Sequence, residues 1–208
     1  MTKQIVITKT PERALNILNG NATLDLNKSV PKDFTGWVNL YVTRKFPALV
    51  DHKLFNDWIK QEMPNHKDGE RFSTFPKEYD YDYFGSILNG KIVARFWFDE
   101  YEKLEYINGQ GFTDDEYVIL ENDNKAHLLW QDIDFIKKTC LEDEVEISNY
   151  GKGKDLYAWH IKKLEIFDKP KDLQEFNIEG ALKYKGEYLP MHHAPQSWQY
   201  VWVKDDNQ

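Results

Sequence analysis

Residues 10–27 read TPERALNILNGNATLDLN, a stretch that places a helix directly before a strand. Thr10 can cap the free amides of a helix, Pro11 suits the first helical position, and the apolar residues that follow recur at helical spacing. Gly20 stands where helices commonly end in a left-handed residue. After it, leucines alternate with polar residues over 23–28, which is the period of a half-buried strand. The stretch therefore predicts a fold that mixes helix and strand.

Further strand patterns are spread along the whole chain. They cover residues 5–8, 36–43, 91–99, 157–167 and 199–203, with the lysine pair 162–163 as a candidate break. Because these strands lie far apart in sequence, they must pair non-locally, and we expect one sheet or one barrel. Two helices are predicted before the strand at 157, one over 132–138 and one that begins near Leu141 and ends before Gly151.

The chain has 208 residues, which fits one large domain. Neither an internal repeat nor a linker rich in Pro, Gly and Ser divides it, so we expect a single domain over 1–208. Residues 45–90 have the weakest pattern and are interpreted as an insertion, in which 51–61 could form a helix.

Composition limits the function classes. The formal net charge is -8, and an acidic chain repels nucleic-acid backbones, so extended non-specific DNA or RNA binding is not expected. The net charge does not exclude a local basic pocket, a small ligand or a basic protein partner. The chain contains 7 Trp, 12 Tyr and 12 Phe, residue types that favour strands and build sites for planar ligands.

Cys140 is the one cysteine of the chain, so no internal disulfide and no cysteine-based zinc site is expected. A reducing cytosol is then the natural compartment. The N-terminus lacks the apolar run of a signal peptide, and no segment approaches membrane-spanning length, which predicts a cytoplasmic protein without membrane association. His192 and His193 are neighbours that point apart on an extended chain, and no acidic ligand is spaced to join them. We expect no metal and no cofactor.

Four strings carry a resemblance to a known family. They are ILNGNATLDLNKSVP (17–31), NGKIVARF (89–96), DLYAWHIKKLEIFDKPKDLQEF (155–176) and APQSWQYVWV (194–203). In order and spacing, from about Ile5 to Val203, the chain resembles phage and prophage proteins of the ASCH family, within the PUA-like superfamily. The resemblance implies an α+β fold: a PUA-like, mostly antiparallel β-barrel with flanking short helices, a cleft beside the first helix, and an inserted segment.

Some small ASCH proteins are hydrolases of an acylated cytidine nucleoside, with a glycine, lysine, threonine and arginine in the turn after the first helix. Here Gly20 matches the glycine, but the lysine position holds Ala22, the threonine position Asp25 and the arginine position Asn27. Alanine serves neither as base nor as nucleophile, and asparagine lacks the charged fork of arginine. No catalytic residue is therefore predicted, and a rebuilt site that uses Asp25 is the remaining enzymatic alternative.

The resemblance favours a binding module for RNA, a nucleoside or a modified base, which would be held by stacking and edge hydrogen bonds. Trp159 and His160 are adjacent on a strand and face opposite ways, so one of the two can face the cleft. The alternatives are a core role for Trp159, a structural hydrogen bond for His160 and a turn anchored by Trp198. The predicted cleft residues are Asn27, Tyr41, Trp159, His160, Gln196, Ser197 and Trp198.

A second hypothesis rests on acidic stretches at 78–82, 114–116 and 142–146. They are either ordinary solvated surface or a face that imitates a nucleic-acid backbone and engages a basic host protein. On the second interpretation the chain is a phage-encoded inhibitor of a host defence nuclease, similar in role to anti-CRISPR proteins. The sequence predicts no oligomeric state.

Overall fold

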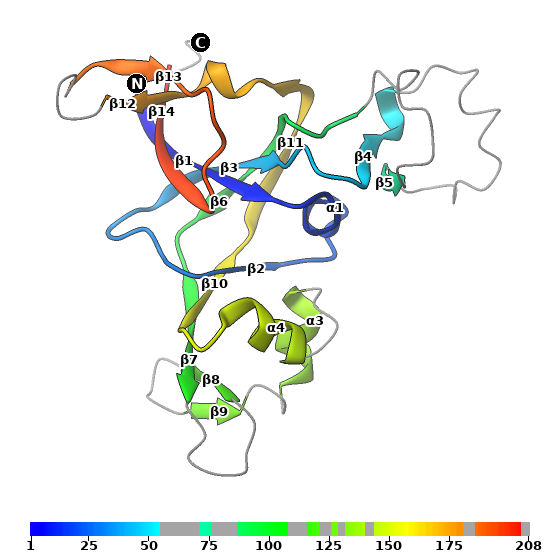
Figure 1. Ribbon diagram of the computed structural model, residues 1–208, viewed down its shortest axis with the longest axis vertical. Helices are drawn as coiled ribbons and strands as arrows, with labels where there is room; N and C mark the ends of the chain where they lie inside the picture. Colours follow the sequence, from blue (N-terminus) through cyan, green and yellow to red (C-terminus); the bar gives the residue numbers. More distant parts are fainter. Residues whose placement is uncertain are drawn as a thin grey trace. The chain divides into compact units, whose positions relative to one another are not determined.

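The computed structural model describes residues 1–54, 71–75, 87–107, 116–120, 126–128, 132–139, 144–180 and 186–204. In this part of the chain strands dominate, and three α-helices are all short. The strands form a seven-stranded, a five-stranded and a two-stranded sheet, and both antiparallel and parallel pairs occur among them (Figure 1). The predicted α+β class is confirmed, while closure of the sheets into a barrel stays a prediction. None of the described helices is long and apolar enough to cross a membrane.

The chain divides into two compact units that alternate along the sequence. The first unit comprises Met1–Asn19, Gly36–Phe96 and Leu164–Gln208, and the second comprises Gly20–Thr35 and Trp97–Lys163. Neither unit is one continuous stretch of sequence. The single domain over 1–208 stays a prediction.

The first unit is built on the seven-stranded sheet. Its order is β11 (Lys162–Lys171), β6 (Ile92–Phe98), β3 (Gly36–Val42), β1 (Thr2–Lys9), β14 (Trp198–Val203), β12 (Asn177–Glu179) and β13 (Tyr188–Pro190). β1 pairs with β3 in parallel and with β14 in antiparallel orientation. The first and last strands of the chain therefore lie side by side at the centre of this sheet (Figure 1).

One face of this sheet is covered by apolar side chains from a segment that follows β11, within residues 173–178 and 191–194. Alternate residues of a strand share a face, so Val6, Tyr41 and Val201 point to the same side. There they pack with Phe176 and Met191 in a buried apolar cluster. A short 3-10 helix, η4 (Leu173–Glu175), begins this covering segment.

A helix and a two-stranded sheet complete the first unit. The helix α1 (Pro11–Leu18) contacts β4 (Ala48–Asp51) and β5 (Phe72–Phe75), and the Asn19 side chain donates a hydrogen bond of 3.3 Å to the Phe72 carbonyl. α1 begins and ends as predicted, and Gly20 after it has φ +73°. Of the helix predicted over 51–61, the described part holds the 3-10 turn η1 (His52–Leu54). The rest of that prediction lies outside the described residues.

The second unit is built on the five-stranded sheet. Its order is β2 (Leu24–Asn27), β10 (Leu156–His160), β7 (Tyr101–Ile107), β8 (Glu116–Leu120) and β9 (Ala126–Leu128). Phe135 of α3 (Ile133–Thr139) and Ile147 of α4 (Glu144–Gly151) join the apolar face of this sheet in one buried cluster. Both helices fall where the sequence predicts helices, and Asp132 caps α3 by accepting a 2.8 Å hydrogen bond from the Phe135 amide.

Two expectations are wrong in detail. The pattern over 157–167 forms two strands, β10 and β11, with the break beside the predicted lysine pair, but the two belong to different sheets, so the strands do not all join one sheet. Lys163, the second residue of β11, has φ +48°, a left-handed conformation that regular strand residues do not adopt, so the start of β11 is irregular. The strand at 24–27 is buried at all four positions rather than half-buried, because Asp25 and Asn27 satisfy each other by a hydrogen bond of 2.9 Å.

Candidate functional site

A pocket of about 310 Å³ opens in the first unit, on the sheet face that also carries the buried apolar cluster. β1 supplies Gln4 and β3 supplies Trp37 and Asn39, which lie two residues apart and so share one face. A volume near 300 Å³ is at the small end of ligand sites and fits one compact molecule. The described lining residues are Thr2, Gln4, Trp37, Asn39, Arg95, Phe167, Lys171, Phe176, Val203 and Lys204.

Two buried amides lie among the lining residues. Gln4 is 7% exposed and Asn39 is 2% exposed. The Asn39 side-chain nitrogen donates to the Gln4 side-chain oxygen at 2.8 Å and to the Ile5 carbonyl at 3.0 Å. Within the described part of the chain, the Gln4 nitrogen and the Asn39 oxygen make no hydrogen bond. Neither atom is among the fully buried unpaired atoms of the described residues, so both reach the pocket surface, where a ligand can pair with them.

Aromatic rings and cations form other parts of the lining. The Arg95 guanidinium lies 4.2 Å from the centre of the Trp37 ring, and its Nε donates to Glu165 at 2.7 Å. The Lys171 ammonium lies 4.8 Å from the centre of the Phe167 ring. No described lining residue carries a carboxylate. The pocket is thus cationic in a chain whose net charge is -8.

A second hollow of about 410 Å³ adjoins the pocket. The two hollows share Lys171, Phe176, Val203 and Lys204, so both lysines belong to the junction. Among the described residues, neither lysine pairs with a carboxylate. The remaining described residues of the second hollow are Gln174, Glu175, Asn177 and Pro190.

Three residues of the predicted cleft lie in the second unit. Trp159 on β10 is 0% exposed, and its ring centre lies 4.8 Å from that of Phe98, which agrees with a core role. Asn27 on β2 is 1% exposed and shares the face of Trp159, because Trp159 lies opposite Asp25 in the antiparallel pairing. His160 faces the other way, and its Nε2 lies 3.0 Å from a Glu102 carboxylate oxygen.

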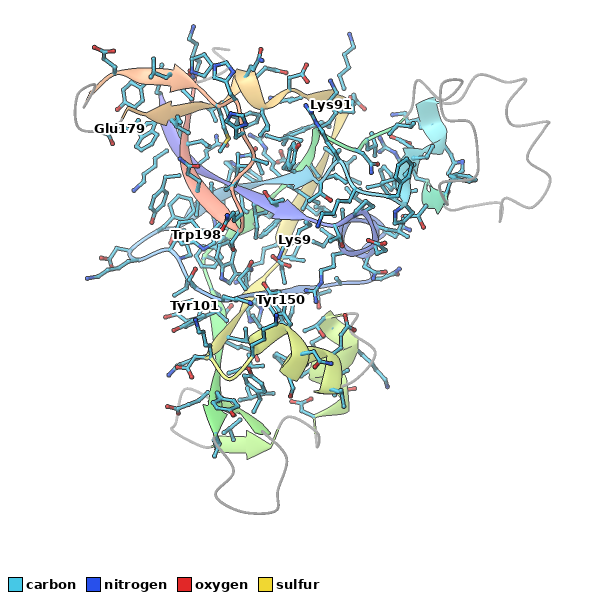
Figure 2. All side chains as sticks on the ribbon, viewed as in Figure 1. Lys9, Lys91, Tyr101, Tyr150, Glu179 and Trp198 are labelled. Carbon is cyan, nitrogen blue, oxygen red and sulfur yellow. The ribbon has the colours of Figure 1, made fainter. Side chains whose placement is uncertain are left out.

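The other four predicted residues lie in the first unit. Tyr41 is 5% exposed and packs in the apolar cluster, on the same face of β3 as Asn39. Trp198 begins β14 (Figure 2), and its ring meets Tyr200 edge-on at 5.4 Å. The Ser197 carbonyl accepts a 2.9 Å hydrogen bond from the Thr8 amide, as in an anchored turn, and Gln196 is exposed.

None of the seven predicted residues lines the pocket, and the residues that do were missed from the sequence. The available signal was a polar side chain inside an apolar strand. Gln4 precedes the run Ile5–Ile7, and Asn39 interrupts a strand that is otherwise apolar. The pairing of these two amides depends on the parallel register of β1 and β3, which no local pattern reveals.

Exposed and buried residues alternate in the turn after α1, where Gly20, Asn21 and Thr23 are exposed. Ala22 is 5% exposed and Asp25 is 4% exposed, and Asp25 accepts a hydrogen bond from Asn27. Among the described residues, no group of three or more His, Cys, Asp or Glu side chains is arranged to hold a metal ion. Cys140 lies outside the described residues, as do 78–82, 114–115 and 142–143 of the acidic stretches.

Comparison with known proteins gives two similar solved structures. No protein-family profile matches the sequence, and no curated protein matches it. The chain aligns with the crystal structure of ASCH from Zymomonas mobilis at a TM-score of 0.46 and 13% identity, over 98% of this chain and 89% of that one. A point mutant of the same Zymomonas mobilis protein aligns at a TM-score of 0.46 and 11% identity, over 98% and 92%. A likeness at this level does not by itself define a family.

Proposed function

We propose that the chain is an ASCH-type, PUA-like binding module of phage or prophage type, which acts in the host cytosol and holds a ligand with a nucleobase. RNA, a nucleoside and a modified base all belong to this class. The family assignment rests on the four sequence strings and on their order. The site assignment rests on the pocket of the first unit.

The observation that carries the proposal is the buried pair of Gln4 and Asn39. The pair offers one N–H donor beside one C=O acceptor, and every nucleobase presents an adjacent acceptor and donor on its Watson–Crick edge. Trp37 and Phe167 supply the aromatic surface that planar rings prefer. A pocket of about 310 Å³ favours one base-bearing unit over an extended polynucleotide.

Calorimetric titration of the four nucleosides and of short single-stranded RNAs tests the proposal. We expect Gln4→Leu, which keeps the side-chain volume, to weaken binding about tenfold because one buried hydrogen bond is lost. The matched control is Gln199→Leu, since Gln199 is an exposed glutamine of the neighbouring strand β14 that does not line the pocket. Thermal melting of both variants checks that each is folded.

Two results contradict the proposal. Wild-type protein that binds neither nucleosides nor RNA rejects the function. Equal affinity of the wild type and of a folded Gln4→Leu variant rejects the site.

The cleft predicted from the sequence is the competing location. Trp159→Ala is unsuited to test it, because loss of a fully buried tryptophan costs about 3–5 kcal/mol of stability and confuses folding with binding. Trp198→Ala is the better variant, since Trp198 is half-buried at the start of β14. Binding that is lost in Trp198→Ala and kept in Gln4→Leu supports the predicted cleft.

A further inference from the structure

Two lysines lie at the junction of the hollows, and the Gln4–Asn39 amide pair does not explain what they bind. Lys171 and Lys204 line both hollows, and within the described residues neither ammonium has a carboxylate partner. Elsewhere in the first unit lysines do pair. Lys91 lies 2.6 Å from Asp172, and Lys53 lies 3.3 Å from Asp168. Two ammonium groups that line the same hollow, with no carboxylate partner among the described residues, are suited to an anion.

The chemistry of the lining restricts the class of anion that the pocket can hold. Gln4 and Asn39 offer neutral amide groups, and Trp37 and Phe167 offer rings. Of the three lining cations, Arg95 donates to Glu165, which leaves Lys171 and Lys204 at the junction with the second hollow. Glu175 also lines that hollow, and its carboxylate accepts a hydrogen bond from the Asp172 amide. A simple inorganic anion would use the lysines alone. A ligand that uses the whole lining needs a planar polar ring at one end and a phosphate at the other.

We infer that the pocket takes a nucleoside phosphate, with the base edge on the Gln4–Asn39 pair and the phosphate between Lys171 and Lys204. This inference rests on the proposed function and names its ligand class. The second hollow, of about 410 Å³, leaves room beyond the phosphate. The phosphate can therefore belong to a free mononucleotide or to the phosphorylated end of an RNA, and the two sources share one chemistry.

The test compares matched ligands by calorimetry: a nucleoside, its 5′-monophosphate, a 5′-phosphorylated trinucleotide, the same trinucleotide without the phosphate, and inorganic phosphate. We expect the monophosphate to bind about tenfold more tightly than the nucleoside, because two charge-assisted contacts are added at a partly screened site. The gain falls as salt is raised. A similar gain for the phosphorylated trinucleotide identifies an RNA end as a second source, and its absence identifies the free mononucleotide.

Lysine variants test whether the affinity gained from the phosphate depends on Lys171 and Lys204. Lys171→Met and Lys204→Met keep the aliphatic stem and remove the charge, so each should lower monophosphate affinity more than nucleoside affinity and bring the ratio of the two affinities closer to one. The matched control is Lys169→Met, because Lys169 lies on the same strand as Lys171, is exposed, and does not line either hollow.

The outcomes separate this inference from the proposed function. Equal binding of nucleoside and monophosphate, with no effect of the lysine variants, overturns the inference and leaves the proposed function standing. Inorganic phosphate that binds as tightly as the monophosphate also overturns it, since the base then contributes nothing. If no ligand of the set binds, both fail.

Discussion

The Asp51 carboxylate lies buried in the first unit and accepts hydrogen bonds from both Arg71 and the backbone of Lys53. Arg71 binds it through two nitrogens, with the shorter contact at 2.8 Å. The hydrogen bond to Asp51 raises the pKa of Arg71, although burial opposes this. The two-point contact between Arg71 and the buried Asp51 charge therefore stabilises the fold. Removing this contact tests how much it contributes to holding β4 and β5 together.

Arg71→Met should lower the free energy of unfolding by about 3 kcal/mol, because it leaves the Asp51 charge buried without its main partner. Lys53→Met is the control. It breaks an ion pair with Asp168 in which both side chains are mostly exposed, and such pairs contribute about 0–1 kcal/mol. Urea unfolding at pH 7 measures both variants. Equal losses of unfolding free energy in the two variants would show that the Asp51–Arg71 contact contributes no more to stability than an exposed ion pair.

Asp155 gives the second unit a pH-dependent contribution. The hydrogen bond from Lys103, at 2.9 Å, and that from the Tyr106 amide, at 3.1 Å, lower the pKa of Asp155. A carboxyl whose pKa is lower in the folded state stabilises the fold above its unfolded-state pKa. That contribution is lost as pH falls through the folded-state pKa.

We therefore expect Asp155→Asn to be less stable than the wild type at pH 7, with a difference that shrinks as the pH falls below about 4. Urea unfolding at pH 7, 5 and 3 measures the difference. Asp168→Asn, in which an exposed carboxylate is removed, should show no comparable trend. A stability difference for Asp155→Asn that stays constant from pH 7 to pH 3 would contradict the assignment.

At the scale of elements, the end of α4 packs so closely against the five-stranded sheet that no side chain fits at Gly151 without a shift of its neighbours. A Cβ atom on Gly151 would overlap the Tyr117 hydroxyl of β8. That hydroxyl donates a 3.0 Å hydrogen bond to the Lys154 carbonyl and so holds the chain between α4 and β10. Glycine at 151 is thus required by close approach.

Gly151→Ala should cost about 1–3 kcal/mol of stability, the usual effect of an added group in a packed core. Tyr117→Phe removes the overlapping oxygen, so the double variant should be more stable than the sum of the two single losses predicts. Thermal unfolding of the four proteins measures the coupling. Additive losses would mean that Tyr117 and Gly151 do not meet.

The sequence predicted elements whose pattern is local. The Thr10 cap, the apolar face of α1 and the glycine after it are all visible in eleven residues, and the long apolar strands read as strands. β7 was missed because YEKLEYI (101–107) buries a single residue, Leu104, among mostly charged neighbours. The break near 162–163 was predicted, but the assignment of β10 and β11 to different sheets was not, because sheet membership has no local signal in the sequence.

At the scale of the whole molecule, the pocket escaped prediction because its residues run from Thr2 to Lys204. They meet through the pairing of β1 with β3 and β14, which is a property of topology. Net charge predicted the class of ligand only in part. The chain carries -8 overall and yet places Arg95, Lys171 and Lys204 around one hollow. The acidic balance argues against extended polynucleotides, and the local charge argues for a compact anionic ligand.

The most direct measurement of the central claim follows the tryptophan indole N–H signals by NMR during titration with a nucleoside monophosphate. Trp37 lines the pocket, whereas Trp159 and Trp198 belong to the cleft predicted from the sequence. Substitution of each tryptophan by phenylalanine assigns its signal. The pocket assignment predicts that the Trp37 signal shifts in a saturable way while those of Trp159 and Trp198 stay in place. Shifts at Trp159 or Trp198 with Trp37 unchanged, or no shift at any tryptophan, would contradict it.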